Sequence, residues 1–152
     1  RPLESGAGRR RPAGDFRAEL QPVQVRTLDE VRGILESGSA RVVDARPAGR
    51  FRGVDPEPRA GLRARHMPGA RNLPYADLVD ATGRMLPPDI LRARLQAAGI
   101  DPDRPVVATC GSGTSSCAVL LALEVLGAPA GALYDGSWTE WGGRDDVPVA
   151  SE

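Results

Sequence analysis

Apolar residues recur at helical spacing in three segments of the chain, each with a recognisable start or end. The first follows Thr27, which forms with Glu30 the capping-box pattern typical of helix starts. The second covers residues 90–98 after a pair of prolines. The third runs from Cys117 to Leu126 and ends before Gly127, a natural left-handed cap. These patterns predict three helices.

Short apolar runs between these segments predict strands, at residues 41–44, 70–73, 106–108 and 132–134. A second capping-box pattern, Ser137 with Glu140, predicts a last helical turn. Because strands and helices alternate along the chain, we expect an α/β fold in which helices cover both faces of a central parallel sheet.

Two segments lack any such pattern. Residues 1–22 are punctuated by Gly and Pro around the basic run Arg9–Arg11, which predicts a linker followed by one domain over residues 23–150. Residues 45–68 form a long charged loop rich in Pro and Gly. Loops of this length inside a compact domain are usually functional.

Composition narrows the class of protein. The 152 residues suffice for one domain with a real core, and 20 arginines balance 20 acidic residues with no lysine present. A net charge of zero predicts no nucleic-acid and no membrane-surface partner, and no apolar run reaches membrane-spanning length. The two cysteines are too few for a disulfide scaffold and favour a cytoplasmic protein. The chain lacks an initiator methionine, which indicates a processed chain or a fragment.

Cys110 is the strongest candidate for chemistry. It stands between the predicted strand at 106–108 and the predicted helix from Cys117, so it lies over the amino end of that helix. Unpaired backbone N–H groups and the helix dipole there favour a negative sulfur, which lowers the thiol pKa and makes the thiolate a usable nucleophile.

The residues after Cys110 suit an anion. Gly111 and Gly113 allow the backbone amides to curl around it, and hydroxyl groups at Ser112, Thr114 and Ser115 add donors that can orient or protonate a leaving group. The alternative to a functional loop is a buried, inert cysteine beside a glycine turn.

Two further interpretations concern neighbouring residues. A cysteine-dependent phosphatase needs an arginine six residues after the cysteine to clamp phosphate, and here that position is Ser116, so this reading fails. Cys117 is expected on the buried face of its helix as a small core residue, with a regulatory disulfide to Cys110 as the alternative.

Arg50 and Arg59, in the long loop, are candidates to bind a small carboxylate beside Cys110. The alternative is a charged loop that is only solvated.

His66, the only histidine, precedes a Pro-Gly turn, which favours a structural role over that of general base. One His and two Cys cannot complete a zinc site, so no metal or organic cofactor is expected. Trp138 is expected to pack in the core, with a place in the wall of the site as an additional possibility.

Three segments together resemble the rhodanese (sulfurtransferase) domain. They are the cysteine loop, His66–Ala70, and Tyr134–Trp141. More narrowly, the chain from about Gly14 to its end is similar to the carboxy-terminal half of 3-mercaptopyruvate sulfurtransferases.

This resemblance implies a sulfur-accepting nucleophile at Cys110, a proton relay including Ser112, and substrate binding by Arg50 and Arg59 and by the loop residues Gly111, Gly113, Thr114 and Ser115. It implies sulfur transfer from 3-mercaptopyruvate, through a Cys110 persulfide, to a thiol such as thioredoxin or to cyanide. The alternatives are thiosulfate as the donor, and a non-catalytic module that docks a partner or carries sulfur. The resemblance also implies an amino-terminal rhodanese half that this chain lacks.

Overall fold

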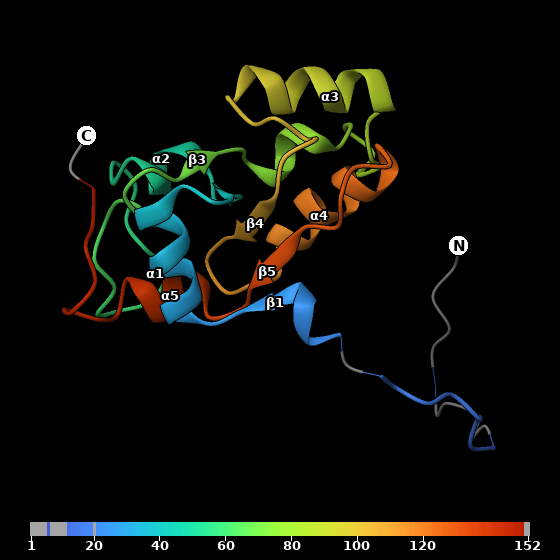
Figure 1. The fold of residues 1–152 in the computed structure, drawn as a ribbon, viewed down its shortest axis with the longest axis horizontal. Coiled ribbons are helices and arrows are strands. Elements are labelled where there is room, and N and C mark those ends of the chain that lie inside the picture. The colour runs from blue at the N-terminus through green and yellow to red at the C-terminus, as the bar shows by residue number, and fades with distance from the viewer. Residues whose placement is uncertain (1–5, 7–11, 20, 151–152) are drawn as a thin grey trace.

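The computed structural model describes residues 6, 12–19 and 21–150 (Figure 1). Residues 12–19 are exposed and adopt no helix or strand, and the basic run Arg9–Arg11 falls outside the described residues. The domain boundary near residue 22 therefore stays a prediction.

A five-stranded parallel sheet forms the centre of the domain, in the order β1-β5-β4-β2-β3. The strands are β1 (Val25–Arg26), β2 (Arg41–Asp44), β3 (Arg71–Asn72), β4 (Val106–Thr109) and β5 (Ala132–Tyr134). The helices are α1 (Leu28–Ser37), α2 (Ala48–Phe51), α3 (Pro88–Ala97), α4 (Ser116–Val125) and α5 (Ser137–Trp141), with 3₁₀ turns η1 (Pro22–Gln24) and η2 (Tyr75–Leu78). The predicted α/β class is confirmed.

Helices cover both faces of the sheet because side chains alternate along its central strands. Val43 and Ala108 belong to the core formed with α3, α4 and η2, whereas Val42 and Val107 belong to the core formed with α1 and α5. Figure 1 shows α3 and α4 lying apart from α1 and α5, with the sheet between the two groups. None of the helices in residues 12–19 and 21–150 is long and apolar enough to cross a membrane.

The carboxyl ends of β2 and β4 meet at the point where the direction of chain winding reverses. Asp44 pairs with Thr109 in register, and the Ala45 N–H donates to the Thr109 carbonyl oxygen at 2.8 Å. After β2 the chain continues to β3 on one side, and after β4 it continues to β5 on the other. Open α/β sheets bind ligands in the crevice outside such a switch point.

The capping box at Thr27 is confirmed. The Thr27 hydroxyl oxygen accepts from the Glu30 N–H at 3.4 Å, and the Glu30 carboxylate accepts from the Thr27 N–H at 2.7 Å. Gly38, with φ +66°, ends this helix in the left-handed conformation.

The predicted capping box at Ser137 is wrong. Ser137 lies in α5 with φ +50°, and its hydroxyl donates to the Tyr134 carbonyl oxygen at 2.9 Å instead of capping a helix. The Glu140 carboxylate accepts from the Tyr134 hydroxyl at 2.7 Å. Both side chains of the expected box therefore have tertiary partners.

The predicted position of Cys117 on a buried helix face is also wrong, since this residue is exposed. The buried face of α4 contains Ser116, Val119, Ala122 and Leu123. At about 100° per residue these four side chains share one side of the helix, and Cys117 falls on the other side. Cys110 and Cys117 are both free thiols.

Candidate active site

A pocket of about 330 Å³ lies at the carboxyl edge of the sheet, where β2 and β4 end. The chain after β2 contributes Arg46, Pro47, Arg50, Pro58 and Arg59, and the chain after β4 contributes Cys110, Gly111, Ser112 and Ser115. The nucleophile candidate and both predicted substrate-binding arginines therefore line one cavity. Gly113 and Thr114 belong to the same loop but are not part of the pocket wall.

Cys110 is fixed through its backbone. Its N–H donates to the Ser137 hydroxyl oxygen at 3.2 Å, and its carbonyl oxygen accepts from the Trp138 N–H at 2.9 Å. The next carbonyl oxygen, of Gly111, accepts from the Thr139 N–H at 2.9 Å. Three successive residues at the start of α5 thus hold the cysteine loop from behind.

The Cys110 sulfur is stabilised as an anion. Burial raises the pKa of the thiol, since only 2% of this residue is exposed, but hydrogen bonds oppose this effect. Backbone N–H groups of Ser112, Ser116 and Ser115 outweigh burial and hold the pKa of Cys110 below its ordinary value. The Ser116 hydroxyl donates to the Gly113 carbonyl oxygen at 2.6 Å and so fixes the loop that carries these donors. The predicted ring of main-chain donors therefore extends to Ser116, which sequence analysis used only to exclude a phosphatase.

Both loop glycines have close neighbours at the position where a side chain would begin. Gly113 has φ +81°, and a Cβ at this position would lie 2.8 Å from Asp135 Oδ1. A Cβ at Gly111 would lie 3.0 Å from Arg50 Nη2. The absence of a side chain at Gly111 therefore lets the Arg50 guanidinium approach the loop that carries Cys110.

Arg50 is held by a buried network of charges. Glu57, with 3% of its side chain exposed, accepts from Arg50 Nη2 at 2.5 Å and from Arg46 Nη1 at 2.8 Å. Arg46 is 1% exposed and also forms a bidentate pair with Asp44, with Nη2 2.7 Å from Oδ2. The network therefore extends from the end of β2 to the pocket wall and fixes Arg50 there.

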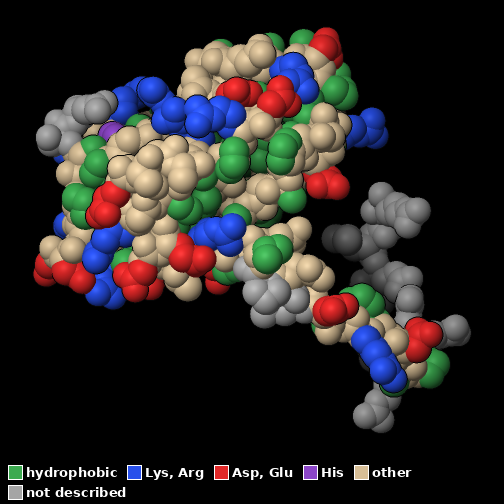
Figure 2. Space-filling model, viewed as in Figure 1, with side chains coloured by type: hydrophobic (Ala, Val, Ile, Leu, Met, Phe, Trp, Pro, Cys, Tyr) green, Lys and Arg blue, Asp and Glu red, His purple; other side chains and the backbone are tan. Residues whose placement is uncertain are grey.

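Arg59 is held differently. Its Nη1 donates to the Thr139 hydroxyl oxygen at 2.9 Å, and it forms no ion pair with any carboxylate in the described part of the chain. The charge of Arg59 is thus available to an anion in the pocket. Figure 2 shows further basic side chains gathered along the edge of the molecule near α2 and β3.

His66 has the structural role that the sequence favoured. Its Nδ1 lies 2.8 Å from the Phe51 carbonyl oxygen, and its ring stacks on the Phe51 ring with centroids 3.8 Å apart.

Trp138 is buried, and its ring lies 4.3 Å beneath the Arg46 guanidinium, so it supports the pocket wall from behind. In the described residues, no group of three or more His, Cys, Asp or Glu is placed to hold a metal ion.

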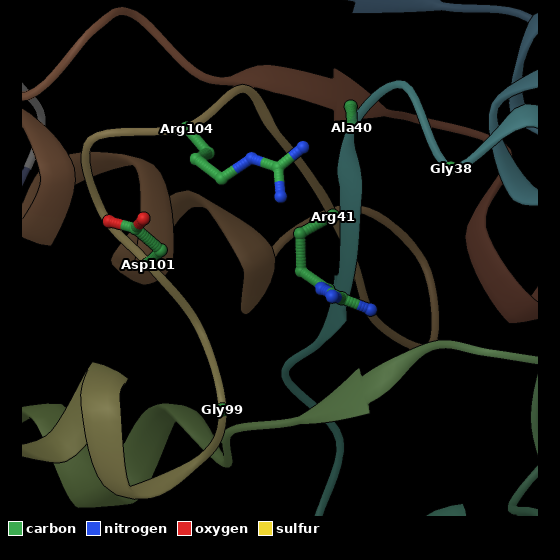
Figure 3. A pocket seen from close by; sticks show the side chains of 6 residues that line it. All are labelled: Gly38, Ala40, Arg41, Gly99, Asp101 and Arg104. Carbon is green, nitrogen blue, oxygen red and sulfur yellow. The ribbon is translucent and has the colours of Figure 1, made fainter.

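A second hollow, of about 170 Å³, lies at the opposite edge of the sheet (Figure 3). Arg41, at the start of β2, and Arg104 line it together with Asp101. Gly38 and Gly99, which follow the carboxyl ends of α1 and α3, complete its wall. Helix carboxyl ends carry negative partial charge, which these arginines offset, and the lining contains no nucleophile. Its residues therefore suit a structural role.

Sequence reasoning left Arg46, Glu57 and Thr139 out of the site. Arg46 lies two residues after the end of β2, beside the switch point of the sheet. Once the order of the strands is known, this position identifies Arg46 as a residue of the site. Glu57 reaches the site by pairing with Arg50 inside the same long loop, and Thr139 reaches it from α5 by pairing with Arg59. No spacing in the sequence reveals either contact.

The site combines a cysteine of lowered thiol pKa with two arginines at the carboxyl edge of a five-stranded parallel sheet. The chain matches the rhodanese-like domain over residues 27–144 and belongs to that family. The predicted resemblance is confirmed.

Several relatives are similar over most of this chain. The human 3-mercaptopyruvate sulfurtransferase is 43% identical over 140 residues, which cover 92% of this chain and 47% of the relative. The 3-mercaptopyruvate sulfurtransferase of Escherichia coli K12 is 43% identical over 147 residues, or 97% of this chain and 52% of the relative. The thiosulfate sulfurtransferase of Bos taurus is 38% identical over 141 residues, or 92% and 47%.

Among solved structures, SseA from Escherichia coli superposes with a TM-score of 0.72 at 38% identity. The match covers 84% of this chain and 47% of that structure. The chain thus spans about half the length of the relatives it matches.

Proposed function

We propose that this chain is the catalytic half of a sulfurtransferase that takes sulfur from 3-mercaptopyruvate. The observation that carries the proposal is the Cys110 thiol, whose pKa is lowered by loop N–H donors in a pocket it shares with Arg50 and Arg59. Relatives named 3-mercaptopyruvate sulfurtransferase support the choice of donor.

In the first step, the Cys110 thiolate attacks the sulfur of 3-mercaptopyruvate. A sulfur–sulfur bond forms and the carbon–sulfur bond breaks, with its electron pair passing to the carbon to give the enolate of pyruvate. The enolate takes up a proton and leaves as pyruvate. Arg50 and Arg59 bind the carboxylate and carbonyl of the donor, and the Ser112 hydroxyl belongs to the proton relay.

In the second step, an acceptor thiolate attacks the outer sulfur of the Cys110 persulfide. The new sulfur–sulfur bond forms on the acceptor, and Cys110 leaves as a thiolate, which the N–H groups of Ser112, Ser115 and Ser116 stabilise. Thioredoxin is an acceptor of the required chemistry. We also propose that a second rhodanese half completes the site, because the relatives are about twice as long as this chain.

Mass spectrometry of the chain after treatment with 3-mercaptopyruvate tests the first step. We expect a gain of one sulfur atom in the protein and in Cys117→Ser, and no gain in Cys110→Ala. A gain that persists in Cys110→Ala, or one that is lost in Cys117→Ser, would place the sulfur elsewhere and contradict the proposal. No gain even when the second rhodanese half is present would favour the non-catalytic module.

Thiosulfate is the alternative donor, since the bovine relative carries that name. Thiosulfate is a compact dianion that is best bound by cations within the cysteine loop, and residues 111–116 contain none. Arg59→Ala should therefore raise KM for 3-mercaptopyruvate much more than KM for thiosulfate. Equal effects would remove Arg59 from recognition of the donor carboxylate.

A further inference from the structure

The Thr139 hydroxyl connects Arg59 to the cysteine loop. Its Oγ1 lies 2.5 Å from the Gly111 carbonyl oxygen and 2.9 Å from Arg59 Nη1. A hydroxyl has one proton to donate and lone pairs to accept with, so Thr139 donates to Gly111 and accepts from Arg59 at the same time. The Thr139 side chain therefore joins Arg59 to Gly111, the residue that follows Cys110.

This arrangement leaves the charge of Arg59 uncompensated. Arg50 faces the Glu57 carboxylate, whose negative charge offsets its own, whereas the hydroxyl that holds Arg59 is neutral. A carboxylate in place of Thr139 would fix the guanidinium equally well but would compete with an anionic ligand for it. Thr139 therefore fixes the position of Arg59 and leaves its attraction for a carboxylate intact.

The backbone of Thr139 also contacts the cysteine loop, so the effect of its hydroxyl on Arg59 can be tested without breaking the backbone contact. The Thr139 N–H donates to the same Gly111 carbonyl oxygen at 2.9 Å. Replacement by valine, which is close to threonine in shape, removes the hydroxyl and keeps this backbone bond. The cysteine loop should therefore stay in place while Arg59 loses its partner.

We infer that Thr139 is a positioning residue that aims Arg59 at the carboxylate of an incoming sulfur donor. The inference deepens the proposed function and rests on it for the identity of the donor. The geometric part, a carboxylate directed to Cys110 by Arg59, can be measured without sulfur transfer.

Alkylation of Cys110 by two matched reagents provides this measurement, in a Cys117→Ser background that leaves one thiol. Iodoacetate carries a carboxylate and iodoacetamide is its neutral counterpart. We expect Thr139→Val and Arg59→Ala to lower the ratio of the iodoacetate rate to the iodoacetamide rate about tenfold, the size expected from loss of a hydrogen bond to a charged group. Thr139→Ser should retain the ratio of the parent, as should Thr82→Val, a change at an exposed threonine outside the pocket.

The iodoacetamide rate reports whether the loop is intact. An unchanged iodoacetamide rate in Thr139→Val, together with a lowered ratio, supports the inference. A ratio equal to that of the parent in Thr139→Val, or a ratio in Thr139→Ser as low as in Thr139→Val, would overturn it. Failure of the chain to gain sulfur from 3-mercaptopyruvate, with the ratios as expected, would count against the proposed function alone.

For steady-state transfer, Thr139→Val should raise KM for 3-mercaptopyruvate and change kcat little, because Arg59 binds the donor but is not the nucleophile. A fall in kcat at constant KM would also overturn the inference.

Discussion

The backbone N–H of Cys110 donates to the hydroxyl oxygen of Ser137, which lies 27 residues further along the chain. Ser137 is fully buried and has φ +50°, a conformation that L-residues other than Asn and Asp rarely adopt. Its hydroxyl also donates to the Tyr134 carbonyl oxygen at 2.9 Å. One small side chain therefore connects the end of β5 with the residue that carries the nucleophile.

Replacement of Ser137 by alanine should destabilise the domain by about 1–3 kcal/mol, because it leaves the Cys110 N–H and the Tyr134 carbonyl buried without this partner. Urea unfolding of Ser137→Ala measures the loss, and Ser39→Ala, at an exposed serine, is the control. A free energy of unfolding equal to that of the control would show that the hydroxyl does not stabilise the loop.

The pH dependence of Cys110 alkylation should reflect its lowered pKa. Only the thiolate reacts, so the rate rises as the pH passes through the pKa, and a lowered pKa moves the midpoint below that of an unperturbed cysteine. Ser116→Ala removes the hydroxyl that donates to the Gly113 carbonyl oxygen at 2.6 Å, so the loop of N–H donors should loosen and the midpoint should move upward. Iodoacetamide kinetics in the Cys117→Ser background measure both. A midpoint at or above that of free cysteine would contradict the assigned environment.

Gly113 and Gly83 form a matched pair of sites for one substitution. Both have positive φ, +81° and +78°, but a Cβ at Gly83 meets nothing within 4 Å, whereas one at Gly113 meets Asp135 Oδ1 at 2.8 Å. Gly83→Ala should cost about 1–2 kcal/mol from backbone conformation alone. Gly113→Ala should cost more and should also slow alkylation of Cys110, since the loop must shift. Equal losses of stability, by thermal unfolding, would show that the contact with Asp135 is unimportant.

Glu57→Ala should be among the most destabilising changes at the site. It leaves the buried Arg46 and the half-buried Arg50 without their shared carboxylate, and loss of one partner from a buried pair costs about 3–5 kcal/mol. Asp55→Ala, at an exposed carboxylate in the same loop, should have a small effect. Urea unfolding of the two variants provides the comparison, and similar losses would argue against the network.

Periodicity predicted the large elements because their apolar residues are the ones that the sheet buries. The run at 132–134 is β5 as expected, and the run at 41–44 is β2. β1 was not predicted, since the two residues Val25–Arg26 are too few to show alternation and form a strand only by pairing with β5. Local spacing also failed at Ser137, whose hydroxyl found partners in β5 and in the cysteine loop.

The part of the site formed by consecutive residues could be predicted from the sequence. The residues around Cys110 follow one another, so their donors could be read from the loop itself. The pairing of Glu57 with Arg50 depends on how the long loop folds back on itself, and the pairing of Thr139 with Arg59 depends on how that loop meets α5. No motif in the sequence specifies either contact.

The meeting of β2 and β4 at the carboxyl edge of the sheet builds the pocket from two separate segments of the chain. The cations come from the chain after one strand and the sulfur from the chain after the other. Because Arg59 contacts Thr139 and Arg46 lies on Trp138, an exchange of residues 46–59 between members of the family must preserve both contacts with α5 to leave the backbone support of Cys110 unchanged.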